Sequence, residues 1–147
     1  MSRSIWGGSV SSTYRIFGRA HDRNASEIII QNIYSQSTNP EAKLDYKKSQ
    51  FKKFIKDVTE GTLEREELIN QTIIDHLSND IDLKKTEKIL KIIVQAAVFE
   101  LLYKHNNSVK VIIVEYLKAA EFFLEKSKVK YLNAILDKLS RILRKSV

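Results

Sequence analysis

Three arginines at four-residue spacing stand near the amino terminus, where they could bind a polyanion. They are Arg15, Arg19 and Arg23, and Tyr14 and Phe17 lie among them. Guanidinium groups bind phosphates and aromatic rings stack on unpaired bases, so the segment combines two contacts used to hold single-stranded RNA. If it extended the first helix, the three arginines would lie along one helix face. The alternative is an arm whose aromatic side chains pack loosely on the rest of the protein.

The composition argues against several classes of active site. The chain has no cysteine, which excludes thiolate catalysis, thiol redox chemistry and cysteine-ligated metals. Its three histidines are isolated, without the Glu-x-x-His pairs of a di-metal bundle or the His-Glu-x-x-His of zinc enzymes. Neither a P-loop nor a Gly-x-Gly-x-x-Gly motif occurs. We therefore expect no enzyme, no bound metal and no cofactor.

The charge balance favours an acidic partner. The formal net charge is +7, which suits nucleic acid or an anionic membrane surface. The alternative is a lysine-rich protein with solvated helix faces. Both explanations also apply to one lysine-rich stretch, whose members are Lys43, Lys47, Lys48, Lys52, Lys53 and Lys56.

The element that must position these residues is residues 89–102, a run that is apolar on nearly every side. A surface helix would show one apolar stripe, so this run belongs inside a bundle. It is too long for an ordinary buried strand, and Lys91, Gln95 and Glu100 interrupt it well short of a membrane span. We predict the central helix of an all-α domain.

Flanking patterns predict the surrounding helices. Apolar periodicity predicts a first helix from about residue 23 to Tyr34, and the sequence Asn39-Pro40-Glu41 has the residue types that start a second. Gly61 is expected to end that second helix, and Thr62 to cap a third.

Later cap residues set the remaining boundaries. We expect Asp82 to cap the central helix, Ser108 the fifth and Ser127 the last. The β-branched run 109–114 allows a strand, but residues 115–124 continue a helical pattern and favour helix.

The predicted architecture is a single-domain, all-α bundle of about six or seven helices. Residues 1–18, rich in glycine and serine, form a flexible basic arm, and residues 19–147 form the helical domain. The amino terminus lacks the apolar core of a secretory signal, so we expect a cytoplasmic protein that does not enter a membrane.

Several motifs agree in order and spacing with one known family. Residues 97–102 (Ala-Val-Phe-Glu-Leu-Leu), 111–116 (Val-Ile-Ile-Val-Glu-Tyr) and 131–138 (Tyr-Leu-Asn-Ala-Ile-Leu-Asp-Lys) stand in the last third. Residues 25–27 (Ala-Ser-Glu) and 31–34 (Gln-Asn-Ile-Tyr) stand in the first helix. Over about residues 23–144 the chain resembles the NusB family of transcription antitermination factors, small all-helical RNA-binding proteins.

The resemblance implies a two-layer NusB-like helical bundle and a set of partners. The RNA would be the single-stranded boxA element of nascent ribosomal RNA transcripts. The protein partner would be the small-subunit ribosomal protein NusE, within an antitermination complex on RNA polymerase. The resemblance leaves self-association open, because apolar surface can be reused to form a homodimer.

The resemblance also assigns roles to residues. The family's first helix opens with an arginine cluster that contacts RNA; Arg23 keeps one of these positions, and Asp22, Asn24 and Ser26 occupy others. Tyr34 matches a tyrosine at the NusE surface, although a rim residue would look the same. Glu87 is a second candidate for partner binding, against a simpler role at the positive end of the helix dipole.

Some motif residues are expected to stabilise the fold rather than bind a ligand, and others differ from the family in a way that suggests an alternative function. The motif carboxylates Glu100, Glu115 and Asp137 are expected to have structural roles. Because arginine positions of the family are replaced, the alternative function is a helical scaffold or protein-interaction module that has lost RNA recognition.

Overall fold

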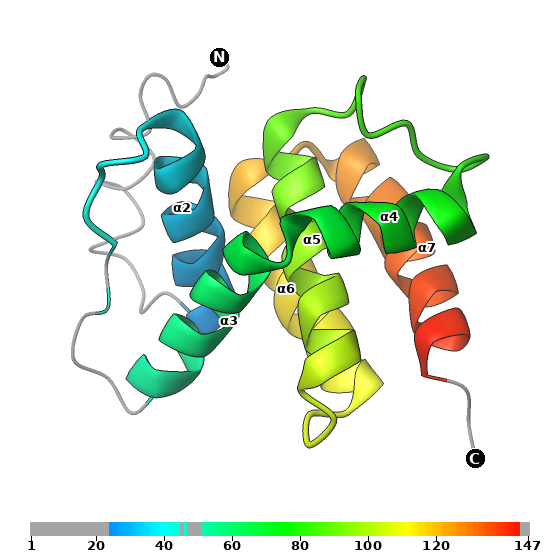
Figure 1. Ribbon diagram of the computed structural model, residues 1–147. Helices are drawn as coiled ribbons and strands as arrows, with labels where there is room; N and C mark the ends of the chain where they lie inside the picture. The colour runs from blue at the N-terminus through cyan, green and yellow to red at the C-terminus, as the bar shows by residue number, and fades with distance from the viewer. Residues whose placement is uncertain (1–23, 45, 47–50, 145–147) are drawn as a thin grey trace.

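The computed structural model describes residues 24–44, 46 and 51–144, and these residues form a helical bundle without strands. Figure 1 shows the helices, whose bounds are α2 Ala25–Thr38, α3 Lys52–Glu64, α4 Glu66–Leu77, α5 Lys88–Tyr103, α6 Val109–Phe123 and α7 Lys126–Leu143. The predicted all-α class is therefore confirmed. The predicted arm lies outside the described residues, so the division of the chain at residue 18 stays a prediction.

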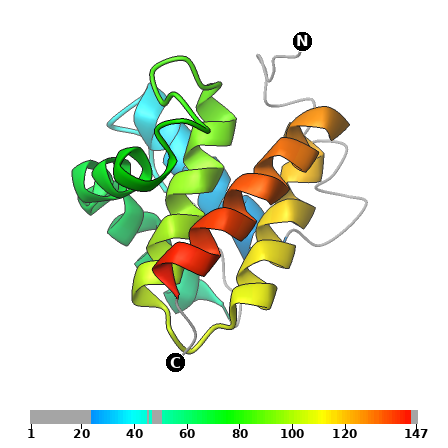
Figure 2. The ribbon, with the colours of Figure 1, turned by 90° about the vertical axis from the view of Figure 1, so that its right-hand side faces the viewer.

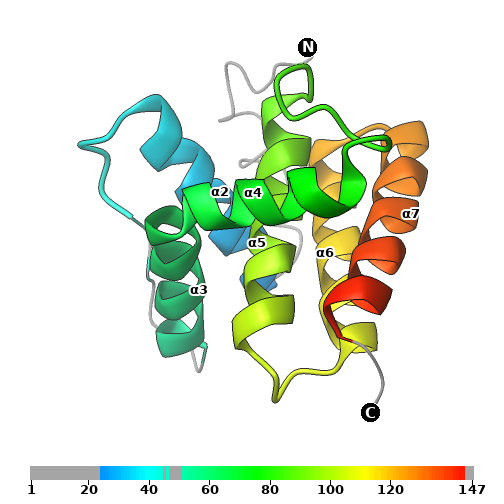
Figure 3. The same ribbon diagram turned by 45° about the vertical axis from the view of Figure 1, so that its right-hand side comes forward.

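Helix α5 lies at the centre of the bundle, as the apolar run predicted. Every residue from Ile92 to Leu101 is buried. The helix contacts each of the other five helices in the described part of the chain. In Figure 1, α2 and α3 stand on one side of α5 and α7 on the other. Figure 2 shows α7 lying over α5 and α6, and Figure 3 shows α4 passing across α5.

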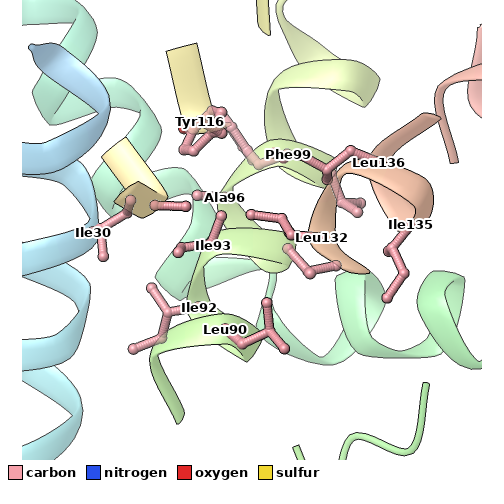
Figure 4. Close-up of a cluster of buried hydrophobic side chains, with 14 of the residues drawn as sticks. Ile30, Leu90, Ile92, Ile93, Ala96, Phe99, Tyr116, Leu132, Ile135 and Leu136 are labelled. Atoms are coloured by element: carbon pink, nitrogen blue, oxygen red, sulfur yellow. The ribbon is translucent and has the colours of Figure 1, made fainter. Parts of the chain in front are cut away.

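The core is built of large aliphatic and aromatic side chains that meet on α5. Figure 4 shows Ile30 of α2, Tyr116 of α6 and Leu136 of α7 gathered around Ile93 of α5, and all four are fully buried. Full burial of each such side chain stabilises the fold by about 1.5–3 kcal/mol. The run 109–114 lies within α6, so the helical interpretation of that stretch is confirmed.

Arg144 closes the carboxyl-terminal end of α5. Its guanidinium donates hydrogen bonds to the carbonyl oxygens of Glu100, Leu101 and Lys104 at 3.0, 2.9 and 2.8 Å. A further bond reaches the carbonyl of Asn107 in the following loop. The last carbonyls of a helix have no intrahelical donor, and this side chain from the end of α7 supplies donors to those of Leu101 and Lys104; the carbonyl of Glu100 also accepts the amide of Lys104.

Two predicted helix starts are wrong, because polar side chains there hold turns instead. Asn39 ends α2, and its side chain accepts the amide of Glu41 at 3.1 Å; the next helix in the described residues begins only at Lys52. Asp82 accepts the amide of Lys84 at 3.0 Å within a turn that precedes α5. Such local side-chain bonds compete with helix formation.

Two other predicted boundaries are displaced. Gly61 and Thr62 lie inside α3, which continues to Glu64. Ser127 lies within the first turn of α7, because the carbonyl of Glu125 already accepts the amide of Val129 at 3.1 Å. The Ser108 cap is confirmed: its hydroxyl accepts the amide of Val111 at 3.2 Å.

Gly61 continues α3 because it allows the close approach of that helix to α5. An ideal Cβ at position 61 would stand 2.3 Å from Cζ of Phe99, whose ring is buried. A side chain at this position would therefore have to displace the ring, which also stacks against Tyr103 at 5.0 Å between centroids.

Glu100 is a carboxyl group buried in the core between α5 and α6. It is 3% exposed and accepts the hydroxyl of Tyr116, which is fully buried. Burial raises the pKa of Glu100 to about 6, while the bond from Tyr116 acts in the opposite direction. Burial also raises the pKa of the Tyr116 hydroxyl, which stays the proton donor. This pair explains the motif glutamate structurally.

The Gly61→Ala variant tests the close approach. Alanine gains about 1 kcal/mol over glycine in helix propensity. Overpacking against Phe99 should outweigh this gain, so we expect a net loss of about 1–3 kcal/mol in the free energy of unfolding, measured in urea. The same substitution in a Phe99→Leu background should cost less, because the ring is gone. A more stable Gly61→Ala single variant would contradict the packing described.

The pH dependence of stability tests the buried carboxyl. The folded pKa of Glu100, about 6, exceeds its ordinary value of 4.5, so ionisation disfavours the fold. The contribution of Glu100 is greatest below pH 4.5 and is lost as the pH rises through 6. Relative to wild type, Glu100→Gln should therefore gain about 2 kcal/mol between these limits, by urea unfolding.

Tyr116→Phe provides the matched comparison. It removes a hydroxyl that favours the carboxylate, so the total loss of stability with rising pH should be larger than in wild type and should extend to higher pH. Parallel pH profiles for wild type and both variants would show that the ionisation of Glu100 is not coupled to folding.

Candidate nucleic-acid and partner interfaces

The point where the amino-terminal segment joins the bundle is held by Asn24. Its side chain accepts the amide of Glu27 at 2.8 Å, and the carboxylate of Glu27 accepts the Asn24 amide at 3.4 Å. This reciprocal capping box begins α2. The Asn24 side chain also donates to the Glu115 carboxylate at 3.2 Å, which joins α2 to α6.

The three predicted RNA-binding arginines, Arg15, Arg19 and Arg23, lie outside the described residues. Arg23 directly precedes in sequence Asn24, the cap that is bound to both α2 and α6. The roles of all three arginines stay predictions.

Two positions where the resemblance places arginines have structural roles in this chain. Asn24 is the cap of α2, and Ser26 is only 3% exposed. Ser26 also hydrogen-bonds to the buried hydroxyl of Tyr116. An arginine side chain would not fit at the buried position 26. The described part of the first helix therefore has less basic surface than the family's arginine cluster implies.

A cavity of about 510 Å³ lies beside the start of α2. Its apolar lining includes Phe51, which is half exposed, Phe54 and Val111. Its polar lining includes Asn24 and Glu115. The cavity therefore adjoins Asn24, which directly follows the predicted RNA-binding segment in sequence, but the carboxyl groups of Glu100 and Glu115 in its lining do not favour a phosphate.

The predicted partner residue Tyr34 lies near the other end of α2. The helix rises about 1.5 Å per residue, so Tyr34 is about 15 Å from Asn24. The Tyr34 ring is half-buried, and the ammonium group of Lys88 lies 5.3 Å from its centroid, within range of a cation–π contact. Tyr34 thus joins the start of α5 to the end of α2.

Glu87, the second predicted partner residue, directly precedes α5, and its side chain binds a lysine of α7 instead of the first turn of α5. Its side chain makes no capping bond to the first turn of α5. It accepts a hydrogen bond from Lys128 of α7 at 2.6 Å. The two side chains are 46% and 40% exposed, so the pair remains open to solvent and contributes little to stability.

The structure brings Tyr34 and Glu87 to the same end of the bundle, because Lys88 contacts Tyr34 and directly follows Glu87. It places the start of α2, and with it the attachment point of the arginines, at the opposite end of that helix. The candidate sites are therefore two surfaces connected by α2. Lys88 and Lys128 were not singled out in the sequence, since a lysine at a helix end has no distinctive spacing.

The lysine-rich stretch is not a purely cationic face. Lys43, Lys52, Lys53 and Lys56 are exposed, whereas Lys47 and Lys48 lie outside the described residues. Asp57 binds Lys53 at 3.1 Å and Lys104 at 3.5 Å. The hydrogen bond from Lys53 lowers the pKa of Asp57, which keeps a negative charge among these lysines.

The other motif carboxylates also have structural partners. Glu115 accepts the Asn24 side chain, and Asp137 pairs with Arg141 one turn later in α7 at 3.0 Å. In the described ranges, no three His, Cys, Asp or Glu side chains gather where they could hold a metal ion. None of the helices in these ranges combines the length and apolar character needed to cross a membrane.

Comparison with known proteins agrees with the motifs. The transcription antitermination protein NusB of Nitrobacter hamburgensis is 32% identical over 91 residues, which are 62% of this chain and 57% of the relative. That of Mesorhizobium japonicum is 34% identical over 84 residues, or 57% and 54% of the two chains. That of Rickettsia felis is 31% identical over 112 residues, or 76% and 69%.

The matches to the first two relatives span a little over half the length of each. The NusB family model itself matches residues 16–141, which include all of α2 to α6 and most of α7. A match over this much of the chain, together with the all-α bundle, shows that the chain belongs to the NusB family.

Proposed function

We propose that this chain is a transcription antitermination factor that binds boxA-type single-stranded RNA together with the ribosomal protein NusE during ribosomal RNA transcription. Membership in the NusB family is the observation that carries the proposal. The curated relatives are named transcription antitermination proteins. The antitermination complex on RNA polymerase would be the assembly in which the chain acts.

The proposed mechanism is positioning. Arg15, Arg19 and Arg23 would bind phosphates, and Tyr14 and Phe17 would stack on bases. The capping box at Asn24 supports this role, because it fixes the point from which these residues extend. The bundle would then hold the transcript close to the polymerase while Tyr34, at the other end of α2, contacts NusE.

A scaffold that has lost RNA recognition is the second candidate, and one observation favours it. Two positions of the family's arginine cluster have become a cap at Asn24 and a buried residue at Ser26. Such a protein would bind NusE without any gain from RNA. Binding measurements with both ligands distinguish the two functions.

The RNA role is tested by titrating labelled boxA-type RNA at several salt concentrations, with and without NusE. Each phosphate contact on single-stranded RNA adds roughly 0.7 to the slope of log affinity against log salt. Replacing Arg15, Arg19 and Arg23 together by glutamine should weaken binding and lower this slope by about 2. If wild-type protein fails to bind at low salt in either condition, the RNA role is wrong.

A control variant carries the same change in charge elsewhere. Lys84, Lys85 and Lys126 are exposed lysines before α5 and at the start of α7, away from the start of α2. Their joint replacement by glutamine should leave the salt slope near its wild-type value. An equal loss in both triple variants would mean that RNA affinity depends on the net charge of the protein rather than on Arg15, Arg19 and Arg23.

The partner surface is tested with Tyr34→Ala. Tyrosines that anchor interfaces typically contribute about 1.4 kcal/mol or more, so we expect affinity for NusE to fall about tenfold or more by calorimetry. Tyr103→Ala is the control, because Tyr103 is 39% exposed at the far end of α5. Equal effects of the two substitutions would remove Tyr34 from the interface.

A further inference from the structure

A groove lies between the end of α2, the α3–α4 region and the first half of α5. Its volume is about 400 Å³, which falls in the range of about 300–1,000 Å³ typical of small-ligand sites. From α5 it is lined by Lys88, Lys91, Ile92 and Gln95. These residues follow the spacing of neighbours on one helix face, so α5 turns a single mixed face toward the groove.

Apolar side chains make up much of the lining. Ile33 of α2, Leu63 of α3 and Ile92 of α5 come from three helices, and Leu63 is half-buried. An extended chain segment could therefore bury one apolar side chain in this groove.

The charged residues of the groove are mostly cationic. Lys88 and Lys91 line it from successive turns of α5, and neither forms an ion pair with an acidic side chain in the described part of the chain. Glu66 is the acid that lines the groove. The nearby Glu87 is already bound to Lys128 at 2.6 Å. The balance favours a ligand with a single negative charge.

A polar group in the same wall supports a ligand of this kind. Thr62 lines the groove, is 2% exposed, and its hydroxyl has no hydrogen-bond partner in the described part of the chain. A buried hydroxyl without a partner is unfavourable, and a ligand oxygen could accept its hydrogen after a small shift.

We propose that this groove docks a short segment of a protein partner in which an acidic side chain stands next to an apolar one. The carboxylate binds Lys88 and Lys91, and the apolar side chain packs against Ile33, Leu63 and Ile92. This inference rests on one part of the proposed function, namely that a protein partner binds at this end of α2. It adds the chemistry of the contact: this part of the partner is acidic.

A peptide explains the groove better than an RNA phosphate does. A nucleic acid would leave the apolar lining unused, and its successive phosphates would be repelled by Glu66 and Glu87. One carboxylate flanked by apolar side chains matches both the charge and the lining. Binding of RNA at the same residues is an outcome that the experiment can detect.

The test uses two peptides, acetyl-Leu-Glu-Leu-amide and acetyl-Leu-Gln-Leu-amide, titrated into the full-length ¹⁵N-labelled protein. The glutamate peptide should shift the amide signals of Gln36, Thr62, Lys88 and Lys91. The glutamine peptide should bind about tenfold more weakly, because it lacks the charge-assisted bonds to the lysines. Equal affinities, or shifts confined to other surfaces, would overturn the proposal.

Two double variants complete the test. Lys88→Gln with Lys91→Gln should abolish the preference for the glutamate peptide, whereas Lys84→Gln with Lys85→Gln should keep it. BoxA-type RNA that shifts the groove residues at lower concentration than the peptide would assign the groove to nucleic acid instead. If a variant fails to fold, the comparison of the two peptides on the wild-type protein still decides the question. The comparison uses neither RNA nor NusE, so a negative result would leave the proposed function unaffected.

Discussion

The enclosure of α5 is the constraint on which the rest of the structure depends. A helix that is buried from Ile92 to Leu101 needs apolar neighbours on every side, and the other five described helices each contact it. Its ends must also be closed, since terminal backbone groups lack intrahelical partners. Arg144 does this at the carboxyl-terminal end, so the last residues of α7 complete the central helix.

Enclosing α5 leaves its ends, and the face of its first half that lines the groove, available for contacts. The start of α5 meets the end of α2 at Tyr34 and Lys88, and it meets α7 through Glu87 and Lys128. The start of α2 is fixed to α6 at the opposite end through Asn24 and Glu115. The two proposed functional surfaces are therefore separated by the length of one helix and share a rigid support.

Polar residues inside the bundle have structural partners, and among them are the motif residues Glu100 and Tyr116. Glu100 binds Tyr116, and Gln95 donates to Asn70 of α4 at 2.8 Å. Such groups are tolerated in a core when they are paired, and they fix the rotation of α5 against its neighbours. Motif residues of this kind identify the family because the fold needs them, so they carry little information about the ligand.

The sequence by itself determined the all-α class, the central helix, the Ser108 cap and the family, because apolar periodicity and motif spacing are local properties. It also pointed to Tyr34 and Glu87, although not to their contacts with Lys88 and Lys128. Only the tertiary structure decided that Gly61 continues a helix and that Asn39 and Asp82 hold turns. The physical reason for Gly61 is that its place inside α3 depends on Phe99, a neighbour distant in sequence. Asn39 and Asp82 have short polar side chains that suit a turn and a helix cap equally well, so their residue types alone do not choose between the two.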